Sequence, residues 1–156
     1  MRKVFCLASW FLFCLPVIAQ NTQQDKNKQV ARGFFEQVLD KGRLELYAES
    51  HAKDFVAHAG DRDATLEEDI AAAKEERQAM PDMRVTVNQI LGDGDLVAVY
   101  WTAFGTNTQA GMGFPATGKK LRVDGMTMFR FKAGKISEEW SVWDMLSVLR
   151  QAGLAK

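Results

Sequence analysis

Residues 121–144, LRVDGMTMFRFKAGKISEEWSVWD, decide the fold because two apolar runs of alternating pattern flank the dipeptide Ala133-Gly134. A period of two is typical of β-strands, and a two-residue link that contains glycine predicts a tight hairpin. Such a loop pairs Phe131 with Ile136 across the two strands. The sequence therefore predicts an antiparallel hairpin close to the C-terminus.

Regular alternation beyond this loop assigns the side chains to two faces and sets Phe129 opposite Glu138. The first face is mostly aromatic and aliphatic, so we expect it to meet the helices; it carries Val123, Gly125, Thr127, Phe129, Phe131, Ile136, Glu138, Trp140, Val142 and Asp144. The second face is mixed and would carry Met126, Met128, Arg130, Ser137, Glu139, Ser141 and Trp143. Its apolar members suit a partner subunit, which favours a homodimer, although a loop or terminal helix of the same chain could cover them instead.

Helical patterns precede the strands. Asp25 is a plausible N-cap for a helix that Gly42 stops, and residues 65–68 form a capping box for a second helix that ends near Met80. The remaining segments are a short turn or helix at residues 44–48, extended segments at 55–58, 84–91 and 96–106, and a short final helix at 145–151. Helices first and antiparallel strands afterwards predict an α+β fold, with a bent sheet and the helices on one side of it, enclosing an apolar pocket.

The first nineteen residues have the pattern of a cleaved export signal. A basic start is followed by an apolar run and a small residue at Ala19. The run is shorter than the ~20 residues that span a membrane, and Pro16 interrupts its end, so no stable membrane anchor is expected. We therefore predict a signal peptide at residues 1–19, a disordered leader at 20–25 and one domain at 26–156, in a periplasmic or secreted protein.

Composition excludes several kinds of chemistry. Both cysteines, Cys6 and Cys14, lie in the predicted signal, so the mature chain would have no disulfide, thiolate nucleophile or cysteine-ligated metal. Cleavage would leave 18 of the 20 basic side chains against 20 acidic ones, a net charge of −2. With no basic stripe, we expect no nucleic-acid partner.

Two side chains are the leading candidates for catalysis. A carboxylate among apolar groups has a raised pKa, which suits Asp144 for acid/base chemistry; alternatively, Asp144 caps the final helix and Glu138 reaches solvent at the sheet edge. His58 ends a short strand and is the better pocket candidate of the two histidines, while His51 is expected at the surface. Their spacing fits no metal-binding pair, so no metal site is predicted.

Several motifs spread over residues 26–153 resemble the SnoaL-like polyketide cyclase and ester cyclase family. They are FVAH at 55–58, MPD at 80–82, GTNT at 105–108, GMGFPATGK at 111–119, FRF at 129–131, GKI at 134–136 and WSVWD at 140–144. The resemblance implies a conical fold of the nuclear transport factor 2-like type, a pocket, and dimerisation through the outer sheet face.

The same resemblance implies that Asp144 is the acid/base of an intramolecular aldol ring closure without metal or organic cofactor, and that His58 lines the pocket. Two positions depart from the family pattern: Asn107 stands where many relatives have histidine, and an arginine is frequent near Trp101. Export also departs from polyketide cyclisation, which is a cytoplasmic task.

The leading hypothesis is a cofactor-free acid/base enzyme that acts on a small, mostly apolar carbonyl compound. Asp144 would move a proton beside the carbonyl and His58 would orient it. The side chains expected to shape the pocket or bind substrate are Trp101, Trp140, Phe129, Phe131, Asn107 and Glu138. One alternative is a non-catalytic domain that binds or carries a small hydrophobic molecule, and another is an accessory dimer with a filled cavity.

Overall fold

A computed structural model describes residues 15–60 and 62–156. Most of the predicted signal, with both cysteines, lies outside the described residues. The elements in chain order are α1 Leu15–Gly33, a π-helical segment Phe34–Asp40, a 3-10 turn Leu44–Leu46, α2 Tyr47–Ser50, β1 His51–Ala59, β2 Arg62–Thr65, α3 Leu66–Ala79, β3 Arg84–Asp93, β4 Leu96–Thr106, β5 Lys120–Lys132, β6 Lys135–Trp143 and α4 Met145–Ala152.

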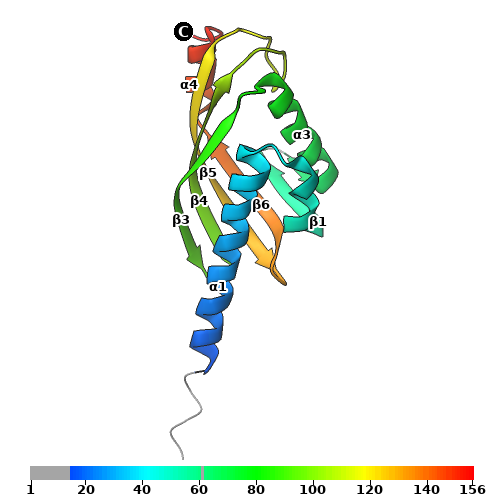
Figure 1. Cartoon of the computed structure of the whole chain (residues 1–156), viewed down its shortest axis with the longest axis vertical. Coiled ribbons are helices and arrows are strands. Elements are labelled where there is room, and N and C mark those ends of the chain that lie inside the picture. The colour runs from blue at the N-terminus through cyan, green and yellow to red at the C-terminus, as the bar shows by residue number, and fades with distance from the viewer. Residues whose placement is uncertain (1–14, 61) are drawn as a thin grey trace, which may run out of the picture.

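Six strands form one bent sheet in the order β2-β1-β6-β5-β4-β3 (Figure 1). Every neighbouring pair is antiparallel except β1 and β6, which run parallel. The helices and the sheet together confirm the α+β class. Strands β1 and β2 extend the sheet beyond the two predicted hairpins, and β2 was not predicted because its four residues carry no alternating apolar pattern.

The β5–β6 hairpin has the predicted loop, but its register shifts by one residue directly after the pair Phe131–Ile136. Ala133 and Gly134 have positive φ angles of 51° and 77°, as a tight hairpin loop requires, and Phe131 faces Ile136. Arg130 then pairs with Glu138, which leaves Ser137 as the extra residue of a β-bulge.

This bulge reverses the predicted faces of β6. A slip of one residue moves every following side chain to the opposite face. Glu139 now lies opposite Phe129 and Ser141 opposite Thr127, so Glu139, Ser141 and Trp143 point toward the helices. The prediction that Glu138, Trp140 and Val142 face inward is wrong; they belong to the outer face.

The helices lie over the concave face of the sheet (Figure 1). Helix α1 already includes Leu15, the first described residue, so the predicted N-cap at Asp25 is wrong, and residues 20–25 are helical where a disordered leader was expected. The capping box of α3 is confirmed, with Glu68 N donating to Thr65 Oγ1 and Thr65 N donating to the Glu68 carboxylate.

Aromatic packing joins the helices to the sheet. Phe34 makes edge contacts with Phe35, Tyr47, His51 and Phe129, and Phe129 is fully buried on β5. Such pairs add to the free energy gained from burial. The cluster holds the start of β1 against the middle of the sheet.

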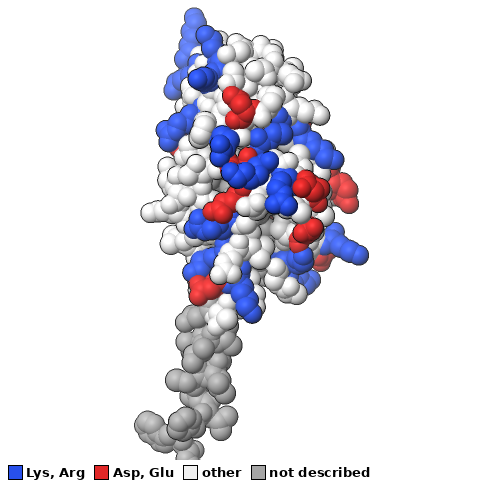
Figure 2. Space-filling model, viewed as in Figure 1, with Lys and Arg blue, Asp and Glu red and all other residues white. Residues whose placement is uncertain are grey.

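The surface is mixed in charge. On the face in Figure 2, basic and acidic side chains of the described part of the chain are interspersed. Among residues 15–60 and 62–156, no helix has the length and apolar character needed to cross a membrane.

Candidate active site

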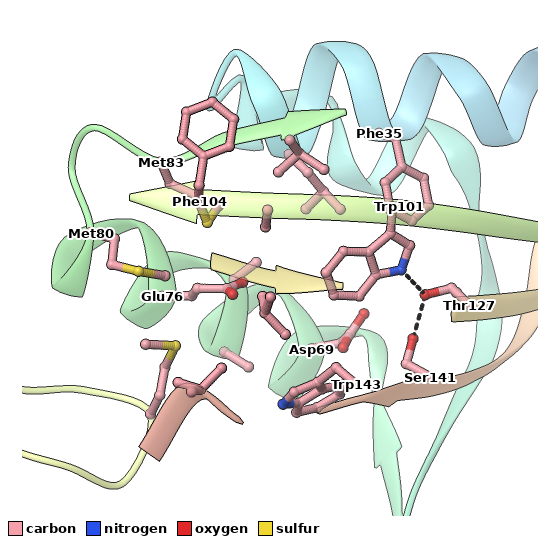
Figure 3. Close-up of a pocket in the computed structure, with 18 of the residues that line it drawn as sticks. Phe35, Asp69, Glu76, Met80, Met83, Trp101, Phe104, Thr127, Ser141 and Trp143 are labelled. Atoms are coloured by element: carbon pink, nitrogen blue, oxygen red, sulfur yellow. Dashed lines mark hydrogen bonds between the residues drawn. The ribbon is translucent and has the colours of Figure 1, made fainter. Parts of the chain in front are cut away.

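A cavity of about 370 Å³ lies between the concave face of the sheet and helix α3 (Figure 3). Its walls are mainly apolar. The residues that line it are Phe34, Phe35, Leu39, Tyr47, Asp69, Ala72, Ala73, Glu76, Met80, Met83, Val85, Trp101, Ala103, Phe104, Met112, Phe114, Leu121, Val123, Thr127, Phe129, Glu139, Ser141, Trp143, Met145 and Val148. A cavity of this size and character suits a small, largely hydrophobic molecule.

Gly125 allows the Trp101 indole to form one wall of the cavity. The two residues are direct partners across β4 and β5, and a Cβ at Gly125 would lie 2.3 Å from Trp101 Cζ2. Only glycine leaves room for the ring to lie across the neighbouring strand.

A chain of hydrogen bonds crosses three strands from Trp101 to Glu139. Trp101 Nε1 donates to Thr127 Oγ1 over 3.0 Å, the hydroxyls of Thr127 and Ser141 are 2.7 Å apart, and Ser141 Oγ donates to Glu139 Oε1 over 2.6 Å. The first links of the chain are drawn in Figure 3. Because Trp101 can only donate, the network fixes the indole and orients the Glu139 carboxyl.

Every charged side chain in the lining is acidic. Asp69 and Glu76 come from α3, and Glu139 comes from β6. Burial raises the pKa of Glu139 to about 7, and the nearby charge of Asp69 contributes to this rise. Burial also raises the pKa of Asp69, although a hydrogen bond from the Tyr47 hydroxyl opposes this effect. The charge of Asp69 therefore disfavours ionisation of Glu139.

Tyr47 supplies the donor that favours the ionised form of Asp69. Burial raises the pKa of Tyr47 well above its usual value, with a contribution from the charge of Asp69, so the phenol keeps its proton. Glu139 accepts only from Ser141 among the described residues and faces the apolar cavity. The environments therefore favour an ionised Asp69 beside a protonated Glu139.

His51 lies behind this pair and is neutral. It is 4% exposed, and burial lowers its pKa to about 4. Nδ1 lies 2.9 Å from the Tyr47 carbonyl oxygen, which fixes the proton on that nitrogen, and buried Nε2 has no partner among the described residues. The prediction that His51 lies at the surface is wrong, because β1 begins four residues earlier than expected.

His51, Asp69 and Glu139 together form a group that could hold a metal ion. One ligand atom each from His51, Asp69 and Glu139 lie within 4.8 Å of one another. A neutral imidazole and two carboxylates are the donors that a divalent metal prefers, and the hydrogen bond at Nδ1 leaves Nε2 available. The spacing of residues along the sequence could not reveal this group, because His51, Asp69 and Glu139 come from three separate elements.

Most of the predicted site residues lie outside the cavity. Asp144 is exposed, and its Oδ1 accepts from Ser147 N at 2.9 Å as the N-cap of α4. Its expected place among aromatic rings is therefore wrong, and the helix-cap alternative is confirmed. The burial that was expected to suit Asp144 for acid/base chemistry is therefore absent.

His58 belongs to a cluster on the outer face. Its Nδ1 lies 2.9 Å from Asp63 Oδ1 and its Nε2 lies 3.1 Å from Glu138 Oε2, while its ring stacks on Trp140. The predicted pocket positions of His58, Glu138 and Trp140 are therefore wrong. The bulge at Ser137 explains the last two.

The remaining predictions divide in two. Trp101 and Phe129 line the cavity as expected. Phe131 is buried in the core near α1 but does not line the cavity. Asn107 is fully buried and pins a loop, since its Oδ1 accepts from Thr117 N and Oγ1.

The residues that the sequence analysis missed share one signal on α3. Asp69, Ala72, Ala73, Glu76 and Met80 recur at helical spacing and all line the cavity. The spacing shows that the two acids share one helix face with the small residues, although by itself such a polar face would ordinarily be assigned to solvent. Glu139 could not be found in this way, because its direction depends on the bulge.

Residues 29–152 match the model of the SnoaL-like polyketide cyclase family. The chain belongs to this family. IdmH of Streptomyces antibioticus, described as a candidate polyketide cyclase, is 31% identical with a TM-score of 0.71, over 81% of this chain and 98% of IdmH. AclR of Streptomyces galilaeus, described as a candidate hydroxylase, is 22% identical with a TM-score of 0.78, over 85% of this chain and 99% of AclR. A similar protein of Acidithiobacillus ferrooxidans, a candidate polyketide cyclase, is 25% identical with a TM-score of 0.71, over 84% of this chain and 96% of that one.

These comparisons confirm the predicted family and its nuclear transport factor 2-like fold. The SnoaL-like membership supports a cofactor-free, cyclase-like role. Comparison with curated proteins gives no match.

Proposed function

We propose that this SnoaL-like protein is a cofactor-free acid/base enzyme that acts on a small, mostly apolar carbonyl compound through Asp69 and Glu139. The observation that carries the proposal is a carboxyl pair held in an apolar cavity, with one member hydrogen-bonded by a phenol and the other given a pKa of about 7. A group titrating near the working pH is the most effective proton donor or acceptor.

The two carboxyls have different roles. Asp69, ionised beside the Tyr47 hydroxyl, removes the proton from the carbon next to the carbonyl. Glu139, protonated, gives its proton to the carbonyl oxygen, so that an enol forms without a free enolate charge. The enol carbon then attacks a second carbonyl of the same molecule and a C–C bond closes the ring. As the first carbonyl re-forms, the enol O–H returns its proton to Glu139, and the new alkoxide takes the proton held by Asp69, so both carboxyls regain their starting states.

The cavity walls support this chemistry by excluding water. Asp69 lies between Trp101 and Trp143 in Figure 3, and Phe35 packs against the Trp101 ring. Electrostatic and hydrogen-bond interactions strengthen in such a low-dielectric setting.

Deuterium exchange into a ketone tests the proposal without a known substrate. In D2O at pH 7, the wild type is expected to exchange the α-protons of 1-tetralone faster than buffer alone, as measured by NMR. Asp69→Asn and Glu139→Gln should each reduce the catalysed rate by about 100-fold, the usual contribution of one acid or base. Glu67→Gln is the matched control, since Glu67 is exposed on the same helix as Asp69 and does not line the cavity. Equal catalysed rates in the wild type and both cavity variants would refute the proposal.

A second candidate is a non-catalytic carrier of a hydrophobic molecule. The hydrogen-bond donors of the cavity favour this candidate. The N–H and O–H groups of Trp101, Tyr47 and Ser141 already donate to other protein groups, so they are not free to bind a substrate carbonyl. Tight binding of 1-tetralone with no exchange above buffer would support this candidate.

We also propose that the chain is exported and forms a homodimer through the outer sheet face. Tyr100, Met126 and Val142 are direct neighbours across β4, β5 and β6 and are 38%, 50% and 70% exposed. An apolar row of this kind is typical of an interface. Val142→Glu should convert the dimer to a monomer in light scattering, and N-terminal sequencing of the exported protein should begin at Gln20.

A further inference from the structure

We propose that the ligand carries a protonated amine and that Glu76 is the residue that selects it. This inference names the class of ligand that the same cavity binds. It rests on the proposed function in one respect only, the assignment of the reacting carbonyl to the end of the cavity near Asp69 and Glu139. Four observations on Glu76 and its surroundings support it.

Glu76 is a carboxylate that faces the cavity without a partner. No hydrogen bond or ion pair to its side chain exists among the described residues, and Figure 3 shows it directed into the cavity. An unpaired carboxylate in an apolar place is destabilising, and burial accordingly raises its pKa. A cationic group of the ligand would provide the missing partner.

The neighbouring arginine is committed elsewhere. Arg77 Nη1 donates to the Met83 carbonyl over 2.7 Å, and Nη2 donates to the carbonyls of Leu39 and Asp40. Within the described residues, the cavity lining contains no lysine, arginine or histidine. An anionic ligand would therefore meet three carboxyls in the lining and no positively charged lining residue, whereas an ammonium would meet the opposite charge. The charge of Arg77 acts on Glu76 from outside the lining, where three backbone carbonyls already hold the guanidinium.

The walls near Glu76 suit an organic cation. Met80 and Met83 lie at the same end of the cavity as Glu76 (Figure 3). Their polarisable thioethers pack against the alkyl groups of such a cation. A small hydrated metal ion gains less from such walls than an amine on a hydrocarbon body.

Glu76 lies at a defined distance from the acid/base pair. It follows Asp69 by seven residues, and both line the cavity. Seven residues of α-helix rise about 10.5 Å. This rise separates the two Cα atoms along the helix, so the ligand should carry its amine and its reacting carbonyl at opposite ends of an apolar segment, with a length on the order of 10 Å.

Three probes of equal length test the inference: 6-phenylhexylamine, 6-phenylhexan-1-ol and 6-phenylhexanoate. Their affinities for the intact protein are measured at pH 7.5 by calorimetry and by quenching of tryptophan fluorescence. The amine should bind about tenfold more tightly than the alcohol, as expected for one charge-assisted hydrogen bond, and the carboxylate should bind most weakly.

Variants of the helix locate the preference. Glu76→Gln should reduce the preference for the amine to within about threefold of the alcohol, while Glu67→Gln should leave it unchanged. Glu76→Asp keeps the charge and should restore most of the preference, which separates a charge effect from a disturbed cavity. Circular dichroism checks that each variant folds.

Three results would overturn the inference. They are equal binding of the amine and the alcohol to the wild type, an amine preference that persists in Glu76→Gln, and no binding of any probe at millimolar concentration. None of these depends on ketone exchange, so the outcome is distinct from that of the proposed acid/base function. A loss of exchange in Asp69→Asn with an intact amine preference would leave both standing.

Discussion

Replacement of Glu139 by glutamine should increase the stability of the protein, but only at neutral and alkaline pH. Burial raises the pKa of this carboxyl from 4.5 to about 7. The folded state therefore holds a proton that the unfolded chain has lost, and the stability of the wild type falls as the pH rises from 4.5 to 7. A shift of about 2.5 pKa units corresponds to roughly 3 kcal/mol.

The glutamine variant removes this dependence. Its amide oxygen can still accept the hydrogen bond from Ser141, and the amide is neutral at every pH. At pH 4 the two proteins should differ by less than about 1 kcal/mol, and at pH 8 the variant should be more stable by on the order of 3 kcal/mol.

Urea denaturation at both pH values, followed by circular dichroism, measures the two differences directly. Glu67→Gln serves as the control, because Glu67 is exposed and should show no comparable pH-dependent gain. If the free-energy difference between Glu139→Gln and the wild type is equal at pH 4 and pH 8, the Glu139 carboxyl does not hold its proton through burial in the cavity, and the reasoning is refuted.

Variants of three further residues, Asp144, Gly125 and His58, test the positions of their side chains. Asp144→Asn should keep both the cap of α4 and the exchange of 1-tetralone, since asparagine caps as well as aspartate, whereas Asp144→Ala should lose about 1 kcal/mol of stability in urea denaturation. Gly125→Ala should destabilise by about 1 to 3 kcal/mol or displace Trp101, seen as altered tryptophan fluorescence, while Gly33→Ala, with open space around it, should not. His58→Gln should leave exchange unchanged and lower stability by less than about 1 kcal/mol at pH 6. This loss should shrink as the pH rises, because hydrogen bonds to two carboxylates raise the pKa of His58 and its contribution is greatest when it is charged.

Local patterns were sufficient to predict most of the elements that form the fold, although not β2 or the start of β1. The alternation in β5 and β6, the dipeptide Ala133-Gly134 and the capping box at Thr65 each depend on residues a few positions apart. The motifs that resemble the SnoaL-like family are also local, and the family match confirms them. Periodicity and loop chemistry therefore located both the last hairpin and α3.

The site could not be predicted in the same way, because one residue decides which side chains of β6 face inward. Ile136 and Ser137 are both buried, and Ser137 Oγ donates to the Arg130 carbonyl over 3.2 Å. Nothing in the local sequence distinguishes this bulge from a regular pair. Every inward position after it was therefore assigned to the neighbouring residue, so Glu138 was chosen in place of Glu139.

The cavity also explains why α3 lacks a strongly apolar face. A helix that only packed on the sheet would place large apolar residues at the positions of Asp69 and Glu76. In this protein those positions hold carboxyls, and burial raises the pKa of each. Ionising them in the folded state is therefore unfavourable. Apolar packing elsewhere, such as the ring cluster around Phe34, must offset this loss. Residues that weaken the fold while facing a preformed cavity are more simply explained by the chemistry of a ligand than by packing, because neutral replacements would stabilise the same helix.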